Sequence, residues 1–141
     1  TFEAAAFLRR TGADTVDVKK LFQSDLEATV ARYRVVQAAR LYRNEIAIAA
    51  YPSTLSRTVA AQAADELLNI SGILTSFVLY PAGEQVIISA RSIGECNVQV
   101  VLEALGGGGN AATAGAQVKG KPLREVLEAL VASIDKFYEN S

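Results

Sequence analysis

Four consecutive glycines, Gly106 to Gly109, constrain the fold of this chain more than any other feature. One glycine is enough to end a helix, and each further glycine costs about 0.5–1 kcal/mol relative to alanine through lost backbone entropy. The run therefore predicts either a backbone that approaches a ligand too closely for any side chain, or a flexible loop. It matches neither the phosphate-binding P-loop nor the dinucleotide fingerprint.

The residues before the glycines favour the ligand interpretation. A β-rich run from Gln85 to Ala90 ends in Arg91, and a helix is predicted over Val98 to Leu105 with Asn97 as its N-cap. A guanidinium at a strand end, an amide at a helix start and the N–H groups of a glycine loop would together suit an anionic ligand.

Each of these residues also has a plainer interpretation. Arg91 could be an exposed arginine at the far end of a hairpin, and Asn97 could be a helix cap and nothing more. Ser92 could bind phosphate, but a serine at a strand end needs no special reason. Cys96 is expected to be an inert thiol, because the sequence contains no histidine to activate it.

The remaining sequence predicts an α+β domain with a mixed sheet of about four strands, flanked by helices that lie mainly on one face. The predicted strands are 45–51, 73–80, 85–90 and 114–119, and the predicted helices are 54–70, 98–105 and one that begins at Lys121-Pro122. The last helix carries an apolar stripe that must face the core: Leu123, Val126, Leu127, Leu130, Ile134 and Phe137.

The first forty residues are predicted to form a helical linker that packs on this domain. Phe2 to Arg10 is rich in helix formers and ends near Gly12, and a short helix is expected over Val16 to Phe22. A capping box at Ser24 to Glu27 predicts the start of a longer helix that continues to Ala39. The resulting division is a linker over 1–40 and a domain over 41–141.

Composition narrows the function classes. The net charge of −1 gives no electrostatic basis for binding duplex DNA. One cysteine and no histidine exclude a typical zinc site, and the acidic residues form no metal-binding group. The single Cys96 fits a reducing compartment and no run is long enough to span a membrane, so we expect a soluble, cytoplasmic chain. The sequence starts at Thr1 and lacks methionine, which suggests a fragment or a chain with omitted residues.

Three stretches carry a family resemblance: SARSIGECNVQVVLEALGGGG followed by NAATAG, the opening TFEAAAFLRRTGAD, and AQAADELLNISGILTSFVL. Together they resemble the DHH-associated domain of bacterial DHH-family cyclic-di-AMP phosphodiesterases, together with the segment that leads out of the catalytic DHH domain. The resemblance covers nearly the whole chain.

The resemblance implies a two-lobed hydrolase with a signalling substrate, in which this chain is the lobe that holds the nucleotide. The catalytic lobe, absent here, would bind two manganese ions, whose bridging hydroxide attacks phosphorus. This chain alone would then hold no metal and be inactive. Its partners would be a cyclic dinucleotide or short oligonucleotide, the parent's own DHH lobe and, in a homodimer, a second copy. The parent could be anchored to the cell membrane. The implied substrate-binding residues are Arg91, Ser92, Asn97, Gly106, Gly107, Gly108, Gly109 and Asn110.

One departure and two alternatives stay open. In the family a histidine and a few more residues normally follow the glycines, whereas here Asn110 follows Gly109 directly. Either the histidine contact with phosphate is lost, or a mobile loop has been left out of the sequence. The alternative functions are an exonuclease lobe acting on short oligonucleotides and a non-enzymatic RNA-binding module. Near-neutral charge and the lack of an aromatic stacking array argue against the RNA module.

Overall fold

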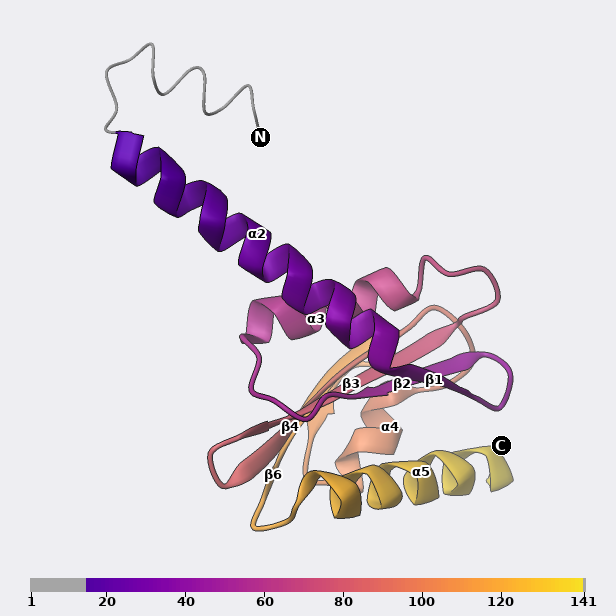
Figure 1. Ribbon diagram of the computed structural model, residues 1–141. Helices are drawn as coiled ribbons and strands as arrows, with labels where there is room; N and C mark the ends of the chain where they lie inside the picture. Colours follow the sequence, from indigo (N-terminus) through magenta and orange to yellow (C-terminus); the bar gives the residue numbers. More distant parts are fainter. Residues whose placement is uncertain (1–14, 141) are drawn as a thin grey trace. The chain divides into compact units, whose positions relative to one another are not determined.

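The computed structural model describes residues 15–140 of the chain (Figure 1). Its helices are α2 (Thr15–Ala38), α3 (Arg57–Leu67), α4 (Val98–Glu103) and α5 (Leu123–Glu139). Its strands are β1 (Ala39–Tyr42), β2 (Ile46–Ala50), β3 (Thr75–Ala82), β4 (Gln85–Ser92), β5 (Gly108–Gly109) and β6 (Thr113–Lys119).

The six strands form one mixed sheet in the order β1-β2-β3-β4-β6-β5. Only β2 and β3 run parallel, because α3 connects them as a crossover, and every other neighbouring pair is antiparallel. The long central strands β3 and β4 are paired along their whole length, from Thr75 opposite Ser92 to Ala82 opposite Gln85. The α+β class predicted from the sequence is confirmed.

Helices cover both faces of the sheet, so the prediction that they lie mainly on one face was wrong. Figure 1 shows α3 on one face and α4 and α5 on the other. The face under α3 buries a small cluster that includes Ala60, Ala64, Val78 and Tyr80. The opposite face buries the larger cluster, to which β2, β3, β4, β6, α4 and α5 all contribute. Alternating side chains on the central strands supply both clusters.

Two of the six strands were not predicted, and each lies at an edge of the sheet. Strand β1 is short, and it turns into β2 through Arg43 and Asn44, whose φ angles are 53° and 68°. Asparagine tolerates this left-handed conformation better than most residues. Strand β5 consists of two glycines, which carry no hydrophobic alternation that could be recognised.

The sequence predicted a break between a short helix ending at Phe22 and a longer helix starting at Ser24. This prediction was wrong, because α2 continues without interruption from Thr15 to Ala38. Serine and aspartate inside a helix cost only about 0.5 kcal/mol each, whereas a break would leave several backbone groups without helical partners. Along α2, Leu26, Val30 and Tyr33 are 51%, 39% and 57% exposed, whereas Val35, near the C-terminal end of the helix, is fully buried.

The predicted helix over 2–10 and its cap at Gly12 lie outside the described residues. By internal contacts the chain separates into two units between Ala31 and Arg32. The linker-and-domain division remains a prediction. Among residues 15–140, no helix combines the length and the apolar character that crossing a bilayer would require.

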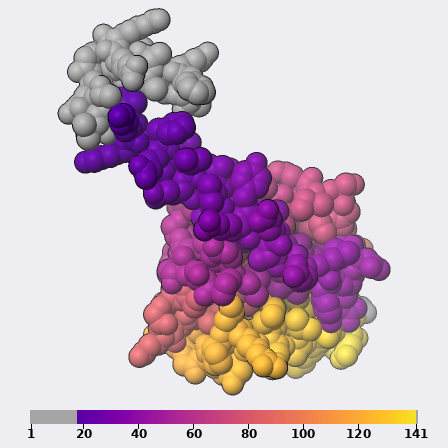
Figure 2. Space-filling view, viewed as in Figure 1, coloured from indigo at the N-terminus to yellow at the C-terminus, as the bar shows by residue number. Residues whose placement is uncertain are grey.

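The last helix forms as its apolar stripe predicts. Helix α5 begins directly after Pro122, and it buries Val126, Leu130 and Ile134 at helical spacing. The other stripe residues, among them Leu123 and Phe137, are partly buried against the same cluster. Figure 2 shows the outer side of α5, in yellow, as a broad part of the surface in this view.

Candidate functional site

The face of the sheet that carries α3 is only partly covered. Helix α3 packs on β3 and β4, which leaves the neighbouring strand β6 open on this side. Because side chains alternate along a strand, the same residues of β4 and β6 face this open area throughout. They are Ile87, Ser89 and Arg91 on β4 and Thr113, Gly115 and Gln117 on β6.

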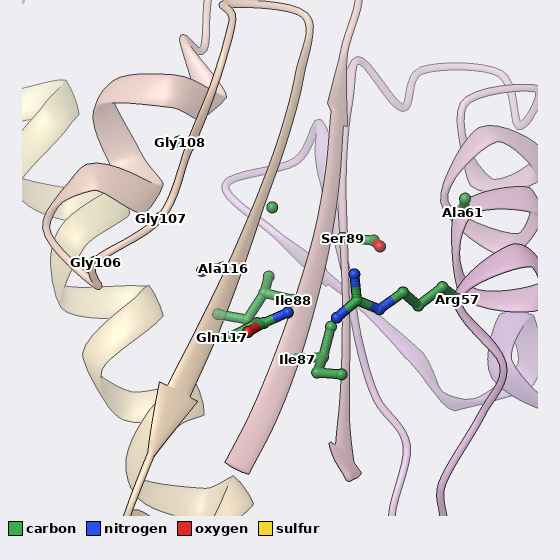
Figure 3. Close-up of a pocket in the computed structure, with 11 residues that line it drawn as sticks. Arg57, Ala61, Ile87, Ile88, Ser89, Gly106, Gly107, Gly108, Ala116 and Gln117 are labelled. Carbon is green, nitrogen blue, oxygen red and sulfur yellow. The ribbon is translucent and has the colours of Figure 1, made fainter.

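A cavity of about 550 Å³ occupies this open area. Figure 3 shows its arrangement: Arg57 and Ala61 of α3 lie on one side, and Gly106 to Gly108 lie on the other. Between them the floor consists of Ile87, Ile88 and Ser89 of β4 and Gly115, Ala116 and Gln117 of β6. The volume lies in the range typical of small-molecule sites.

Three of the four glycines of the run have a structural reason to lack a side chain. Gly106 has a φ of +81°, as expected of a glycine that ends a helix. A Cβ on Gly107 would overlap the Gly115 carbonyl oxygen, and a Cβ on Gly109 would overlap the Thr113 carbonyl oxygen. Close approach to β6 therefore explains two of the four glycines without any ligand.

Gly108 has no such internal reason. A Cβ on Gly108 would meet nothing within 4 Å, and its φ is not in the left-handed range. Gly108 pairs with Gly115, so both residues face the same side of the sheet, which is the cavity side. At Gly108 the missing side chain keeps the cavity open.

The expectation that the loop's N–H groups face a ligand is wrong for part of the loop. The N–H of Gly106 donates to the Glu103 carbonyl at 3.1 Å, and that of Gly107 donates to the Leu102 carbonyl at 2.8 Å. These bonds satisfy carbonyls at the C-terminal end of α4. Gly106 and Gly107 therefore contribute space to the cavity and no free donor.

Arg91 lies on the cavity's face of the sheet, two residues beyond Ser89, but it does not line the cavity itself. Its Nε donates to Asp65 Oδ1 of α3 at 3.1 Å, and its Nη1 donates to the Ala90 carbonyl at 2.8 Å. Its side chain is 18% exposed, against 66% for Asp65. Arg91 and the glycine run are thus at the same end of the sheet, since Arg91 pairs with Thr113 and Gly109 pairs with Ala114.

Three other predicted site residues have structural roles and lie outside the cavity lining. Ser92 is buried, and its hydroxyl lies 3.2 Å from that of Thr75. Asn97 caps α4 by accepting from the N–H groups of Gln99 and Val100, which confirms the predicted cap. Asn110 Oδ1 accepts from Ala112 and Thr113 N–H, both at 2.9 Å. This turn joins β5 directly to β6. A role of these three in binding stays a prediction.

The sequence interpretation missed Arg57, which lines the cavity from the first turn of α3. Figure 3 shows its side chain extending from the helix towards Ile87 and Ser89 of β4. The only local signal was its position directly after Ser56, which caps the helix by accepting from the Val59 N–H at 3.1 Å. That signal marks a helix start and does not indicate which way the arginine points.

The residues that the structure describes do not fit a manganese site. Across residues 15–140, no three side chains of the histidine, cysteine, aspartate or glutamate type come together as metal ligands. Manganese prefers several oxygen or imidazole ligands, and the cavity's lining contains neither a carboxylate nor an imidazole.

Comparison of the sequence with known proteins identifies the family of this chain. The family model described as the DHHA1 domain matches residues 44–140. The chain is 42% identical over 144 residues to the cyclic-di-AMP phosphodiesterase GdpP of Bacillus subtilis, with 99% of this chain and 22% of that protein aligned. It is 38% identical over 142 residues to the cyclic-di-AMP phosphodiesterase PdeA of Listeria monocytogenes, with the same shares aligned. The chain thus spans about a fifth of the length of these relatives.

Solved structures share the fold at lower identity. An exopolyphosphatase-related protein from Bacteroides fragilis superposes with a TM-score of 0.67 at 19% identity, covering 96% of this chain and 43% of that one. The pGpG-specific phosphodiesterase PggH from Vibrio cholerae superposes with a TM-score of 0.59 at 16% identity, covering 85% of this chain and 43% of that one. At these identities the likeness concerns the fold alone.

Proposed function

The chain belongs to the DHHA1 domain family, and from this premise we propose that it is the nucleotide-binding lobe of a phosphodiesterase that hydrolyses cyclic di-AMP to the linear dinucleotide. The relatives with about 40% identity are cyclic-di-AMP phosphodiesterases, and they align with 99% of this chain. The hydrolysis itself belongs to the parent protein in this proposal, and this chain contributes binding and orientation.

The observation that carries the proposal is the cavity between Arg57 and the glycine run. Its floor includes Gly115, which has no side chain, and Ser89, whose side chain is small, and together they leave room for a flat ligand. One wall lacks side chains at Gly106 to Gly108, and the other carries a guanidinium. A space bounded by bare main chain and a cation suits a ligand that combines a planar base with a phosphate.

In the proposal the metal chemistry comes from elsewhere in the parent. Manganese would supply a bridging hydroxide from the DHH lobe, because the described residues of this chain offer no ligand group. We expect the 141-residue chain to show no phosphodiesterase turnover with manganese. Robust turnover by the chain alone would refute this division of labour.

Binding can be tested without catalysis. Titration of the ¹⁵N-labelled chain with cyclic di-AMP should shift the amide resonances of Gly108, Ser89 and Gly115, since these residues line the cavity. The residues around Ser133, in a separate groove between α4 and α5, serve as an internal control. Absence of shifts at the glycines, or shifts confined to the Ser133 groove, would contradict the proposal.

The same titration separates the substrate classes. A linear two-nucleotide RNA is the matched competitor, because it has the same bases and sugars without the ring closure. The proposal expects tighter binding of the cyclic form, and in the intact parent a higher kcat/KM for it. A preference for the linear RNA in both measurements would favour the exonuclease alternative.

A further inference from the structure

Among the arginines that the structure describes, Arg57 differs from most in that it forms no ion pair with a carboxylate. Four arginines each hold a carboxylate within 3.6 Å or less: Arg32, Arg43, Arg91 and Arg124. Arg57 makes no such ion pair, although it lines the cavity. Its guanidinium is exposed, and its five N–H donors are available to a ligand.

The helix brings Arg57 and Asp65 to the same side of the site. Arg57, Ala61 and Asp65 follow each other at spacings of four residues, so they lie in one row along α3. Asp65 holds Arg91 at one end of the row, and Arg57 extends into the cavity at the other end. The two ends are separated by about 12 Å of helix, at about 1.5 Å per residue. The small side chain of Ala61 leaves the wall between them open.

Tyr80 gives a second observation beside Arg57. This residue is fully buried, it pairs with the cavity residue Ile87, and its hydroxyl has no hydrogen-bond partner. Burial raises the pKa of Tyr80, and the charge of Arg57 acts against that rise. Tyr80 is therefore a second polar group without a hydrogen-bond partner, paired across the sheet with a residue that lines the cavity.

We infer that Arg57 is a ligand-binding residue of this cavity, where its guanidinium pairs with a phosphate of the bound nucleotide at the end opposite the Arg91–Asp65 pair. The inference rests on the proposed function and adds to it a second cation. A ligand in the cavity would then contact Arg57 directly, while Arg91, which lies outside the lining and is paired with Asp65, would act on it only through its charge. Arg57 holds and orients the ligand, and no chemical step is assigned to it.

The test compares Arg57→Gln, Arg57→Lys and a matched control, Arg124→Gln, by calorimetric titration of the 141-residue chain with cyclic di-AMP. Arg124 lies on α5, is 90% exposed and pairs with Glu128, so its loss changes the net charge equally without touching the cavity. Arg57→Gln should weaken binding about tenfold, as expected for one charged hydrogen-bonded contact. Arg57→Lys should recover part of the loss, because it keeps the charge without the bidentate fork.

The salt dependence provides an independent readout. Losing a phosphate contact should flatten the fall of affinity with added salt for Arg57→Gln and not for Arg124→Gln. The melting temperatures of all three variants should match that of the parent chain, because none of these side chains is buried.

The outcomes distinguish this inference from the function it rests on. If the unmodified chain gives no cyclic di-AMP binding, the proposed function fails and Arg57 has no ligand to hold. If the unmodified chain binds and Arg57→Gln binds equally well, only the role of Arg57 is overturned. Equal losses in Arg57→Gln and Arg124→Gln would also overturn it, because they would indicate a long-range charge effect and no contact.

Discussion

The guanidinium of Arg91 is joined to Asp65 by an Nε–Oδ1 contact of 3.1 Å, which ties the end of β4 to the last turns of α3. The two residues are 26 positions apart in the sequence. This pair decides how much positive charge the nearby cavity receives from Arg91, because Asp65 neutralises part of it.

Replacing either partner should therefore change ligand binding in opposite directions. We expect Arg91→Ala to weaken cyclic di-AMP binding, since it removes a cation and leaves Asp65 as an unpaired anion. Asp65→Asn should leave binding unchanged or make it tighter. Stability should fall by less than about 1 kcal/mol in both variants, because Asp65 is 66% exposed. Calorimetric titration and thermal melts test this, and weaker binding by Asp65→Asn would contradict it.

The glycine run predicts a contrast between two neighbouring alanine substitutions. Gly107→Ala should destabilise the fold by more than about 1 kcal/mol, because its Cβ would overlap β6. Gly108→Ala should leave stability unchanged or raise it by about 0.4–1 kcal/mol, because its Cβ meets nothing and the unfolded chain loses freedom.

For ligand binding, the informative position is Gly108, because its missing side chain is on the cavity side. Gly108→Val, which places a larger side chain on the cavity side, should reduce cyclic di-AMP affinity while the chain remains folded. Urea denaturation and titration on the same samples give both quantities. If Gly108→Val bound the ligand normally, the glycine run would have only the structural role seen at Gly107.

A cluster at the opposite edge of the sheet predicts a pH-dependent contribution to stability. Asp135 on α5 accepts from the Tyr42 hydroxyl and pairs with Arg43 Nη2 at 3.0 Å. The pKa of Asp135 is lowered, first by the hydrogen bond from Tyr42; burial opposes this shift, and the hydrogen bond and charge of Arg43 add smaller lowering effects. A carboxyl whose pKa is lower in the folded state stabilises the fold above its unfolded pKa, and it loses that contribution as the pH falls.

Asp135→Asn should therefore be less stable than the parent chain at pH 7, and the difference should shrink as the pH falls through the folded pKa, below about 4. Urea denaturation at pH 7, 5 and 3 measures this, with Asp25→Asn on α2, an exposed position, as a control for removing one negative charge. A stability difference that stayed constant from pH 7 to pH 3 would show that the ionised form of Asp135 is not what stabilises the cluster.

Cys96 is predicted to be unreactive in the folded chain. Its side chain is 1% exposed, and its pKa is raised, mainly by burial, although hydrogen bonds with Tyr138 and Thr75 oppose the shift. Its reaction with a colorimetric disulfide reagent should be slower in the native state than in denaturant by at least about two orders of magnitude, because the thiol becomes accessible only on opening. Equal rates in the two states would place the thiol at the surface.

The sequence by itself determined most of the elements of the domain. The apolar stripe of α5, with Val126, Leu130 and Ile134 in register, and the cap at Asn97 are local patterns, and the structure contains both. These predictions succeeded because helical periodicity and capping depend on residues within one or two turns of each other. The predicted helix start at the Ser24 capping box was wrong. A capping box is also a local pattern, but its preference is weak, and the backbone hydrogen bonds of the continuous helix α2 outweighed it.

Only the tertiary structure decided what the glycines and the arginines do. Gly107 and Gly109 must lack side chains because β6 passes beside them. Arg91 is held by Asp65, whereas Arg57, an unremarkable residue in the sequence, reaches the cavity. These facts depend on strand order and on the placement of α3 across the sheet, which bring together residues up to sixty positions apart. Local sequence carries no information about such distant neighbours, so the site could be expected from the sequence but its lining could not.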